Sequence, residues 1–212
     1  MAEHSFDNGT ALSTTGSSQK RHLQGWRSKS TLYNSAIDYV VLQFYVLAVF
    51  NYATQDLLSD ESWLHDNGTA SEYNFCDWDN TDCNGRTDIT ALSPLGSQLS
   101  GSLTPEIGLL TSLTTLGLES KTFTATLPTE VGLLTSLNYL DLSDNTFTGK
   151  FPTDIGLLTS LTDLFLDINT FTVSHPTEIG LLASLTGALG LDINTFTGTL
   201  PHFDKSQLSI FV

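Results

Sequence analysis

Basic residues are scarce in this chain, and their scarcity excludes one class of partner. Its 212 residues include 8 Lys and Arg against 23 Asp and Glu, which gives a formal net charge of -15 at pH 7. A surface that binds nucleic acid needs clustered cations to neutralise the phosphates. The sequence therefore predicts no nucleic-acid partner, and two interpretations of the acidic charge stay open: a basic protein or peptide partner, and solubility alone.

The residues and motifs of common enzymes are also sparse. The five histidines are scattered, the two cysteines form no CxxC pair, and no HExxH, GxSxG, GxGxxG or P-loop sequence occurs. The acidic run DWDNTD has Asp82 at the sixth position, where a calcium loop needs glycine. We interpret this run as a polar loop. The sequence predicts no enzyme, no catalytic residue, no metal site and no cofactor.

Long apolar runs are absent as well. One apolar stretch, YVVLQFYVLAVF at 39–50, follows a cluster of basic residues, as a membrane anchor would. It is interrupted by Gln43 and is well short of the ~20 residues that a spanning helix needs. Two interpretations stay open at this point: a membrane anchor, and a buried amphipathic helix.

What the chain has in abundance is internal repetition. A 24-residue unit reads TSLTTLGLESKTFTATLPTEVGLL from Thr111, TSLNYLDLSDNTFTGKFPTDIGLL from Thr135 and TSLTDLFLDINTFTVSHPTEIGLL from Thr159. A fourth copy, with one extra residue, begins at Ala183, and a weaker copy begins at Ile89. Repetition at such a period predicts a solenoid, in which each unit buries its apolar side against its neighbours. Solenoids usually bind other molecules.

The unit resembles the leucine-rich repeat, most closely its plant-type class, LxxLxxLxLxxNxFxGxIPxxIGxL. Anchors of this template in the 135–158 unit include Leu137, Leu140, Leu142, Asn145, Phe147, Gly149, Pro152, Ile155 and Gly156. The resemblance covers 89–201. It implies an α/β fold: a right-handed leucine-rich-repeat solenoid of about five 24-residue repeats with one parallel sheet. It also implies a non-enzymatic module that recognises proteins or peptides, or acts as a scaffold.

The segment before the repeats resembles the N-terminal cap of the same class, which carries Trp-rich sequence and a Cys pair. The resemblance implies a helical cap over 36–88, with 39–50 as its buried helix, and a disulfide between Cys76 and Cys83. A disulfide indicates an oxidising compartment, so an extracytoplasmic or membrane-associated location is favoured over the cytosol. No basic and then apolar signal sequence follows Met1, which points the other way.

The remaining segments complete the predicted organisation. Residues 1–35 are rich in Ser, Thr, Gly and Asn and are expected to form a flexible extension. Residues 202–212 form a tail in which Ile210 falls near the next strand position. This tail is one way to cover the open edge of the sheet. The oligomeric state is not predicted.

The outward side chains of the predicted strands form the first candidate surface. On this concave face, aromatic residues stand beside acids, as anchors do in many protein interfaces. The candidate protein-binding residues are Tyr139, Asp141, Asp144, Asp163, Phe165, Asp167 and Asp192.

A second candidate surface comes from the Thr-Phe-Thr of every full unit. Alternation places each Phe inward and both Thr outward, so stacked units would form two parallel threonine ladders. Such an array is similar to the TxT surface of β-solenoid ice-binding proteins, and ice binding is the alternative function. The residues are Thr122, Thr124, Thr146, Thr148, Thr170, Thr172, Thr195 and Thr197. A further alternative is a structural subunit of a larger assembly, whether or not membrane-bound, that docks through 39–50 or the C-terminal edge.

Overall fold

The computed structural model describes residues 42–43, 45–47, 49–50, 53–54, 76, 81–85, 88–94, 99–172, 177–197 and 209–211. All of them belong to one compact unit, Val40–Val212. The predicted extension at 1–35 and most of the tail at 202–212 lie outside the described residues.

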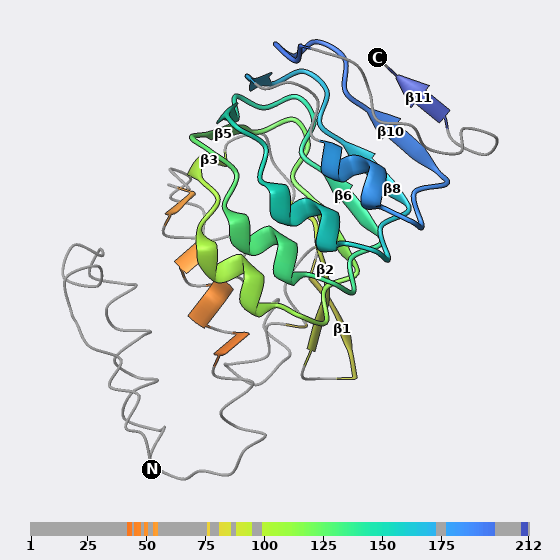
Figure 1. Ribbon diagram of the computed structural model, residues 1–212. Coiled ribbons are helices and arrows are strands. Elements are labelled where there is room, and N and C mark those ends of the chain that lie inside the picture. Colours follow the sequence, from red (N-terminus) through yellow and green to blue (C-terminus); the bar gives the residue numbers. More distant parts are fainter. Residues whose placement is uncertain are drawn as a thin grey trace, which may run out of the picture. The chain divides into compact units, whose positions relative to one another are not determined.

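One sheet runs through all the described repeats (Figure 1). Its seven strands lie in the order β1 (Thr81–Asn84), β2 (Asp88–Leu92), β4 (Thr115–Gly117), β6 (Tyr139–Asp141), β8 (Asp163–Phe165), β10 (Ala188–Gly190) and β11 (Ser209–Phe211). The pair β1–β2 is antiparallel, and the other pairs are parallel. Thr115 lies opposite Tyr139, and Tyr139 opposite Asp163, so these strands stack in register with the repeat. The prediction of a parallel-sheet leucine-rich-repeat solenoid is confirmed.

Each repeat continues through a second short strand and a single helical turn. The short strands β3 (Ser100–Ser102) and β5 (Thr122–Thr124) pair with each other, as do β7 (Thr148–Gly149) and β9 (Thr170–Phe171). The turns are 3-10 helices: η3 (Pro105–Leu109), η4 (Thr129–Leu133), η5 (Thr153–Leu157) and η6 (Thr177–Leu181). They stack as one column in front of the main sheet in Figure 1.

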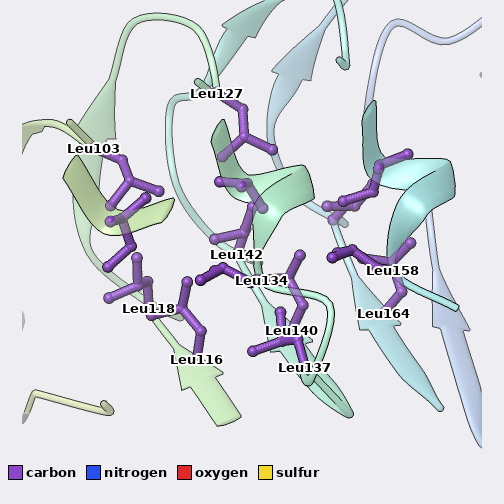
Figure 2. Packing of buried hydrophobic residues seen from close by; sticks show 14 of the residues in the cluster. Leu103, Leu116, Leu118, Leu127, Leu134, Leu137, Leu140, Leu142, Leu158 and Leu164 are labelled. Atoms are coloured by element: carbon purple, nitrogen blue, oxygen red, sulfur yellow. The ribbon is translucent and has the colours of Figure 1, made fainter. Parts of the chain in front are cut away.

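The core is a repeated set of leucines and phenylalanines. Figure 2 shows leucines from the strands and from the helical turns pointing into the same interior, among them Leu140, Leu142 and Leu134, all fully buried. The Phe of each Thr-Phe-Thr adds a stack of rings along the solenoid. Ring centroids of Phe123 and Phe147 are 5.8 Å apart with an interplanar angle of 3°. A unit therefore buries its apolar face only by contact with the next one.

The template asparagines form a hydrogen-bonded ladder between units. Asn145 Oδ1 accepts the Phe123 N–H at 3.0 Å, and Asn145 Nδ2 donates to the Leu118 carbonyl at 2.7 Å. Both partners belong to the preceding unit. Asn169 and Asn194 repeat the arrangement one and two units further on. The ladder satisfies buried backbone groups at the turn that would otherwise lack partners.

The N-terminal residues that the structure describes pack against the first repeats. Residues 42–43, 45–47, 49–50 and 53 are helical. The side chains of Val46, Leu47 and Phe50 are buried in the same cluster as the repeat leucines. Gln43 Oε1 accepts the Ile89 N–H of β2 at 2.6 Å. This packing supports the cap-helix interpretation of 39–50.

Two further observations concern the N-terminal region. The predicted disulfide is confirmed, with Cys76 and Cys83 bonded and their Cα atoms 5.6 Å apart. Among the residues that the structure describes, no helix is both long enough and apolar enough to span a bilayer.

The C-terminal edge of the sheet carries one more strand. β11 pairs in parallel with β10, and Ile210 lies opposite Leu189, as its sequence position suggested. The extra residue of the 183–201 unit is absorbed before β10, because Leu189 pairs with Leu164. There the Ala188 N–H donates to the Asp163 Oδ1 carboxylate oxygen at 2.9 Å, so a side chain replaces the usual backbone acceptor.

Candidate binding surfaces

Two aromatic side chains stand together on the outward face of the main sheet. Tyr139 on β6 and Phe165 on β8 are diagonal neighbours, because Tyr139 lies opposite Asp163 and Phe165 opposite Asp141. Their ring centroids are 5.7 Å apart, with planes inclined by 50°. Both side chains are half-buried, so each keeps a solvent-facing edge. Strand alternation predicted these two residues on one surface, and the structure brings them into contact.

Asp141 is a fixed part of this surface. Only 8% of it is exposed. Its carboxylate accepts hydrogen bonds from the Tyr139 hydroxyl at 3.0 Å, the Ser143 N–H at 2.9 Å and the Ser143 hydroxyl at 2.6 Å. Burial, followed by the nearby Asp141 carboxylate, raises the pKa of Tyr139 above its usual value. Tyr139 therefore stays a hydrogen-bond donor, and Asp141 holds its ring in place.

Asp163 also has a structural task, which the sequence pattern did not reveal. Besides the Ala188 N–H, its carboxylate accepts the Thr162 hydroxyl at 2.8 Å. A Cβ at position 187 would stand 2.1 Å from Asp163 Oδ1, so Gly187 is what leaves room for this side chain. Asp163 thus joins the last units together, and it is less free to contact a partner than its outward register suggested.

Asp167 lies among the acidic residues of this face. Burial raises the pKa of the Asp167 carboxyl, and the carboxylates of Asp192, Asp141 and Asp144 raise it further. Gly190 opens the space beside it. A Cβ there would be 2.3 Å from Asp167 Oδ1. Negative charge is therefore concentrated next to the Tyr139–Phe165 pair.

Two isoleucines were not among the predicted binding residues. They are Ile168 and Ile193, each of which comes directly before an asparagine of the asparagine ladder. The residue at this place in each unit has a positive φ: 54° at Ser120, 52° at Asp144, 52° at Ile168 and 49° at Ile193. A β-branched residue seldom adopts this left-handed conformation. The exposed fractions of Ile168 and Ile193 are 40% and 67%. The sequence signal for these exposed isoleucines is the repeated DINTFT, in which Ile occupies the position that Asp144 has in the 135–158 unit.

The threonine surface has a geometry different from the predicted one. The flanking threonines are exposed and each Phe of the first three full units is buried, as the alternation predicted. However, Thr148 lies opposite Thr170, two residues short of the 24-residue period. Ser100 and Thr122 are offset in the same way. The second threonine of one unit therefore lies beside the first threonine of the next, and the columns run obliquely instead of as two straight ladders.

The two threonine columns also differ in hydrogen bonding. The first threonine of each unit donates its hydroxyl to a backbone carbonyl of the preceding unit, as Thr146 does to Phe123 at 2.7 Å and Thr170 does to Phe147 at 2.7 Å. In the second column, Thr124 donates to Gly101 at 3.0 Å. The structure gives no hydrogen bond from the hydroxyls of Thr148 and Thr172 to any residue that it describes. The first column thus helps to hold the strands together, and the second presents freer hydroxyls.

Comparison with solved structures places this architecture among known proteins. A chain of the BIR3–SERK2 complex from Arabidopsis thaliana is 27% identical, with a TM-score of 0.67 over 79% of this chain and 92% of that one. The LRR ectodomain of the receptor kinase SOBIR1 from Arabidopsis thaliana has 22% identity and a TM-score of 0.63, over 81% of this chain and 91% of that one. The chain has the plant-type leucine-rich-repeat fold.

A third solved structure bears on the threonine surface of this leucine-rich-repeat protein. It is described as a plant ice-binding protein, and it is 27% identical with a TM-score of 0.62, covering 72% of this chain and 48% of that one. No family model and no curated protein matches the sequence.

Proposed function

We propose that this leucine-rich-repeat protein is a non-enzymatic recognition module that binds a basic protein or peptide through its concave face. The observation that carries the proposal is the Tyr139–Phe165 pair beside the carboxylates around Asp167. Aromatic residues are enriched among the few that dominate interface energies. A cation placed beside Asp167 would relieve the repulsion among its acidic neighbours.

The rigidity of this face supports the same proposal. Asp141 is held by three hydrogen bonds, and the strands beneath it stack in register on a packed core. A preformed surface loses little conformational freedom on binding, so more of the contact energy remains as affinity. The solved complex of BIR3 with SERK2, one chain of which is similar to this one, is an assembly of two proteins.

We place the protein in an extracytoplasmic compartment. The Cys76–Cys83 disulfide supports this location, because disulfides persist in oxidising compartments. The similar LRR fold of the SOBIR1 receptor kinase is described as an ectodomain. Growth of cells that express the tagged full chain, followed by thiol labelling with and without reductant, tests the location. Cysteines that label without reductant in the native cell would contradict it.

The decisive experiment compares two charge-reversed variants of the full chain. Asp167→Lys/Asp192→Lys changes the concave face beside Tyr139 and Phe165, and Asp82→Lys/Asp88→Lys makes the same change in charge on β1 and β2, at the N-terminal end of the sheet. Proteins captured from native extract by the unaltered chain are identified, and the association rate of the principal one is measured at two salt concentrations. We expect the concave variant to slow association about tenfold or more and to weaken its salt dependence, and the control to retain binding. Equal binding by both variants would refute the concave-face assignment.

A second function, ice binding, is favoured by one specific observation. The protein presents oblique columns of exposed threonines, and one similar solved structure is a plant ice-binding protein. Flat arrays of hydroxyl and methyl groups are a suitable surface for ordered water. Thr148→Tyr/Thr172→Tyr should abolish ice shaping and inhibition of recrystallisation, and Thr135→Tyr/Thr159→Tyr, placed beyond the helical turns, should leave them unchanged. Absence of both activities in the unaltered full chain would eliminate this candidate.

A further inference from the structure

A row of exposed leucines runs along the column of helical turns. Each IGLL sequence, or VGLL in the 111–134 unit, contributes one buried and one exposed leucine. The second, at 110, 134, 158 and 182, is buried in the core. The first is exposed by 38% at Leu109, 52% at Leu133, 53% at Leu157 and 62% at Leu181. We name these four exposed residues the leucine stripe. Large exposed apolar side chains are ordinary when scattered, but a contiguous row indicates an interaction site.

A row of acids accompanies the stripe. Each helical turn carries an acid three residues before its exposed leucine: Glu106, Glu130, Asp154 and Glu178. Side chains three residues apart in a 3-10 helix lie one above the other, so each acid and its leucine share a face. The contacts of the adjacent turn agree, because a Cβ at Gly156 would be 3.1 Å from Leu181 Cδ1 and 3.3 Å from Glu178 Cβ.

The glycine of each turn keeps these rows close together. A Cβ at Gly108 would be 2.5 Å from the Glu130 carbonyl oxygen, and one at Gly132 would be 2.5 Å from the Asp154 carbonyl oxygen. Without a side chain at this position, each turn approaches the next directly. The result is a continuous surface with one leucine and one acid per repeat. The plant-type template requires only the buried leucine of the pair, so the exposed leucine is a feature of this sequence and not of the template.

We propose that the leucine stripe is a docking site for a basic amphipathic α-helix of a partner protein, separate from the concave face. The spacing and the charge both point to this occupant. Phe rings of successive repeats are 5.8 to 6.1 Å apart, and an α-helix rises about 5.4 Å per turn. A helix lying along the column would thus set one apolar side chain per turn against one leucine per repeat. Lys or Arg on its flank would face the row of acids.

Charge argues against the other occupants. A second copy packed back to back would bring its own row of acids against Glu130 and Asp154, and like charges repel. An anionic membrane surface is disfavoured for the same reason. A helix with cations on one flank is attracted by the same carboxylates, and their position along the column orients it.

Synthetic 15-residue helical peptides and the full chain test the proposal. One peptide repeats leucine once per turn with lysine on the flank, a second replaces each lysine with glutamate, and a third keeps the first composition in shuffled order. Binding is measured by fluorescence anisotropy at low and moderate salt. The variants are Leu133→Asn/Leu157→Asn, Glu130→Gln/Asp154→Asn, and the matched control Thr135→Asn/Thr159→Asn, and circular dichroism checks that each is folded.

We expect the lysine peptide alone to bind the unaltered chain. The leucine variant should weaken this binding about tenfold or more, because the two central leucines of the stripe are lost. The acid variant should weaken it several-fold and flatten its salt dependence, and the threonine control should be unchanged. The proposal is overturned if the leucine variant binds the lysine peptide as well as the unaltered chain does, or if the glutamate peptide binds equally. Failure of the lysine peptide to bind would also overturn the proposal in two cases. The first is a dimer in sedimentation equilibrium that is lost in the Leu133→Asn/Leu157→Asn variant. The second is cosedimentation with anionic vesicles that is lost in the same variant.

Discussion

Replacement of Asn145 by alanine should remove one rung of the ladder and loosen the joint between two units. Asn145 is only 7% exposed. Its amide bonds to the Phe123 N–H and the Leu118 carbonyl of the unit before, and to two carbonyls of its own unit. Alanine cannot replace any of these bonds. The Phe123 N–H loses its partner.

The magnitude follows from the buried groups that lose a partner. An unsatisfied buried donor or acceptor costs about 1 to 3 kcal/mol, and at least two such groups are left at this position. We therefore expect the free energy of unfolding to fall by about 3 to 5 kcal/mol. This is a large share of the ~5 to 15 kcal/mol that stabilises a typical domain.

Urea unfolding followed by circular dichroism measures the change, and amide exchange at Phe123 localises it. Two readouts are needed because units of a solenoid contact mainly their neighbours, so unfolding can depart from two states. The matched control is Lys121→Ala, at the same position of the preceding unit, where the change should stay within about 0.5 kcal/mol. A loss below about 1 kcal/mol in Asn145→Ala, or an equal loss in the control, would refute the role given to the ladder.

Three further predictions concern the concave face and the cap. Gly190→Ala should displace the Asp167 carboxylate and the Phe165 ring. It should therefore weaken binding of the concave-face partner about tenfold and have little effect on binding to the leucine stripe. Equal affinity of the variant and the unaltered chain for the concave-face partner in a binding titration would contradict this. Because the pKa of Asp167 is raised in the folded state, its contribution to stability is greatest at low pH and falls as pH rises past its ordinary value. Asp167→Asn should therefore raise the urea midpoint of unfolding at pH 7 but not below about pH 3. A lower midpoint at pH 7 would contradict the raised pKa of Asp167. Reduction of the Cys76–Cys83 bond, whose residues are 7 apart, should lower stability by about 2 kcal/mol, and Cys76→Ser/Cys83→Ser should be insensitive to dithiothreitol.

The repeating part of the fold was predictable because each repeat poses the same local problem. Leu140 and Leu142 are buried and Tyr139 faces outward, since alternation along a short strand leaves no other choice. The 24-residue period then places Tyr139 opposite Asp163. The Cys76–Cys83 bond was likewise within reach, because the family resemblance supplied it.

The details that the sequence did not reveal arise from contacts between units. The offset between Thr148 and Thr170 depends on how far each unit is displaced along the next, which a single unit does not encode. Asp163 was assigned to a partner because its register is outward, yet its carboxylate bonds to the Ala188 N–H beside the extra residue. Position in a strand predicts the direction of a side chain, and neighbours decide how much of it is left to bind a ligand.

The asparagine ladder gives the protein a mechanical polarity. Every rung reaches backward, so each of the last three units grips the unit before it. At the joint between 89–110 and 111–134 the ladder position holds Lys121, whose ammonium cannot accept a backbone N–H. Under tension along its axis, the array should therefore part first at this seam, and the four later units, which the three asparagine rungs join, should stay together as one segment. An optical-trap record would show a short first extension followed by a longer, more cooperative one.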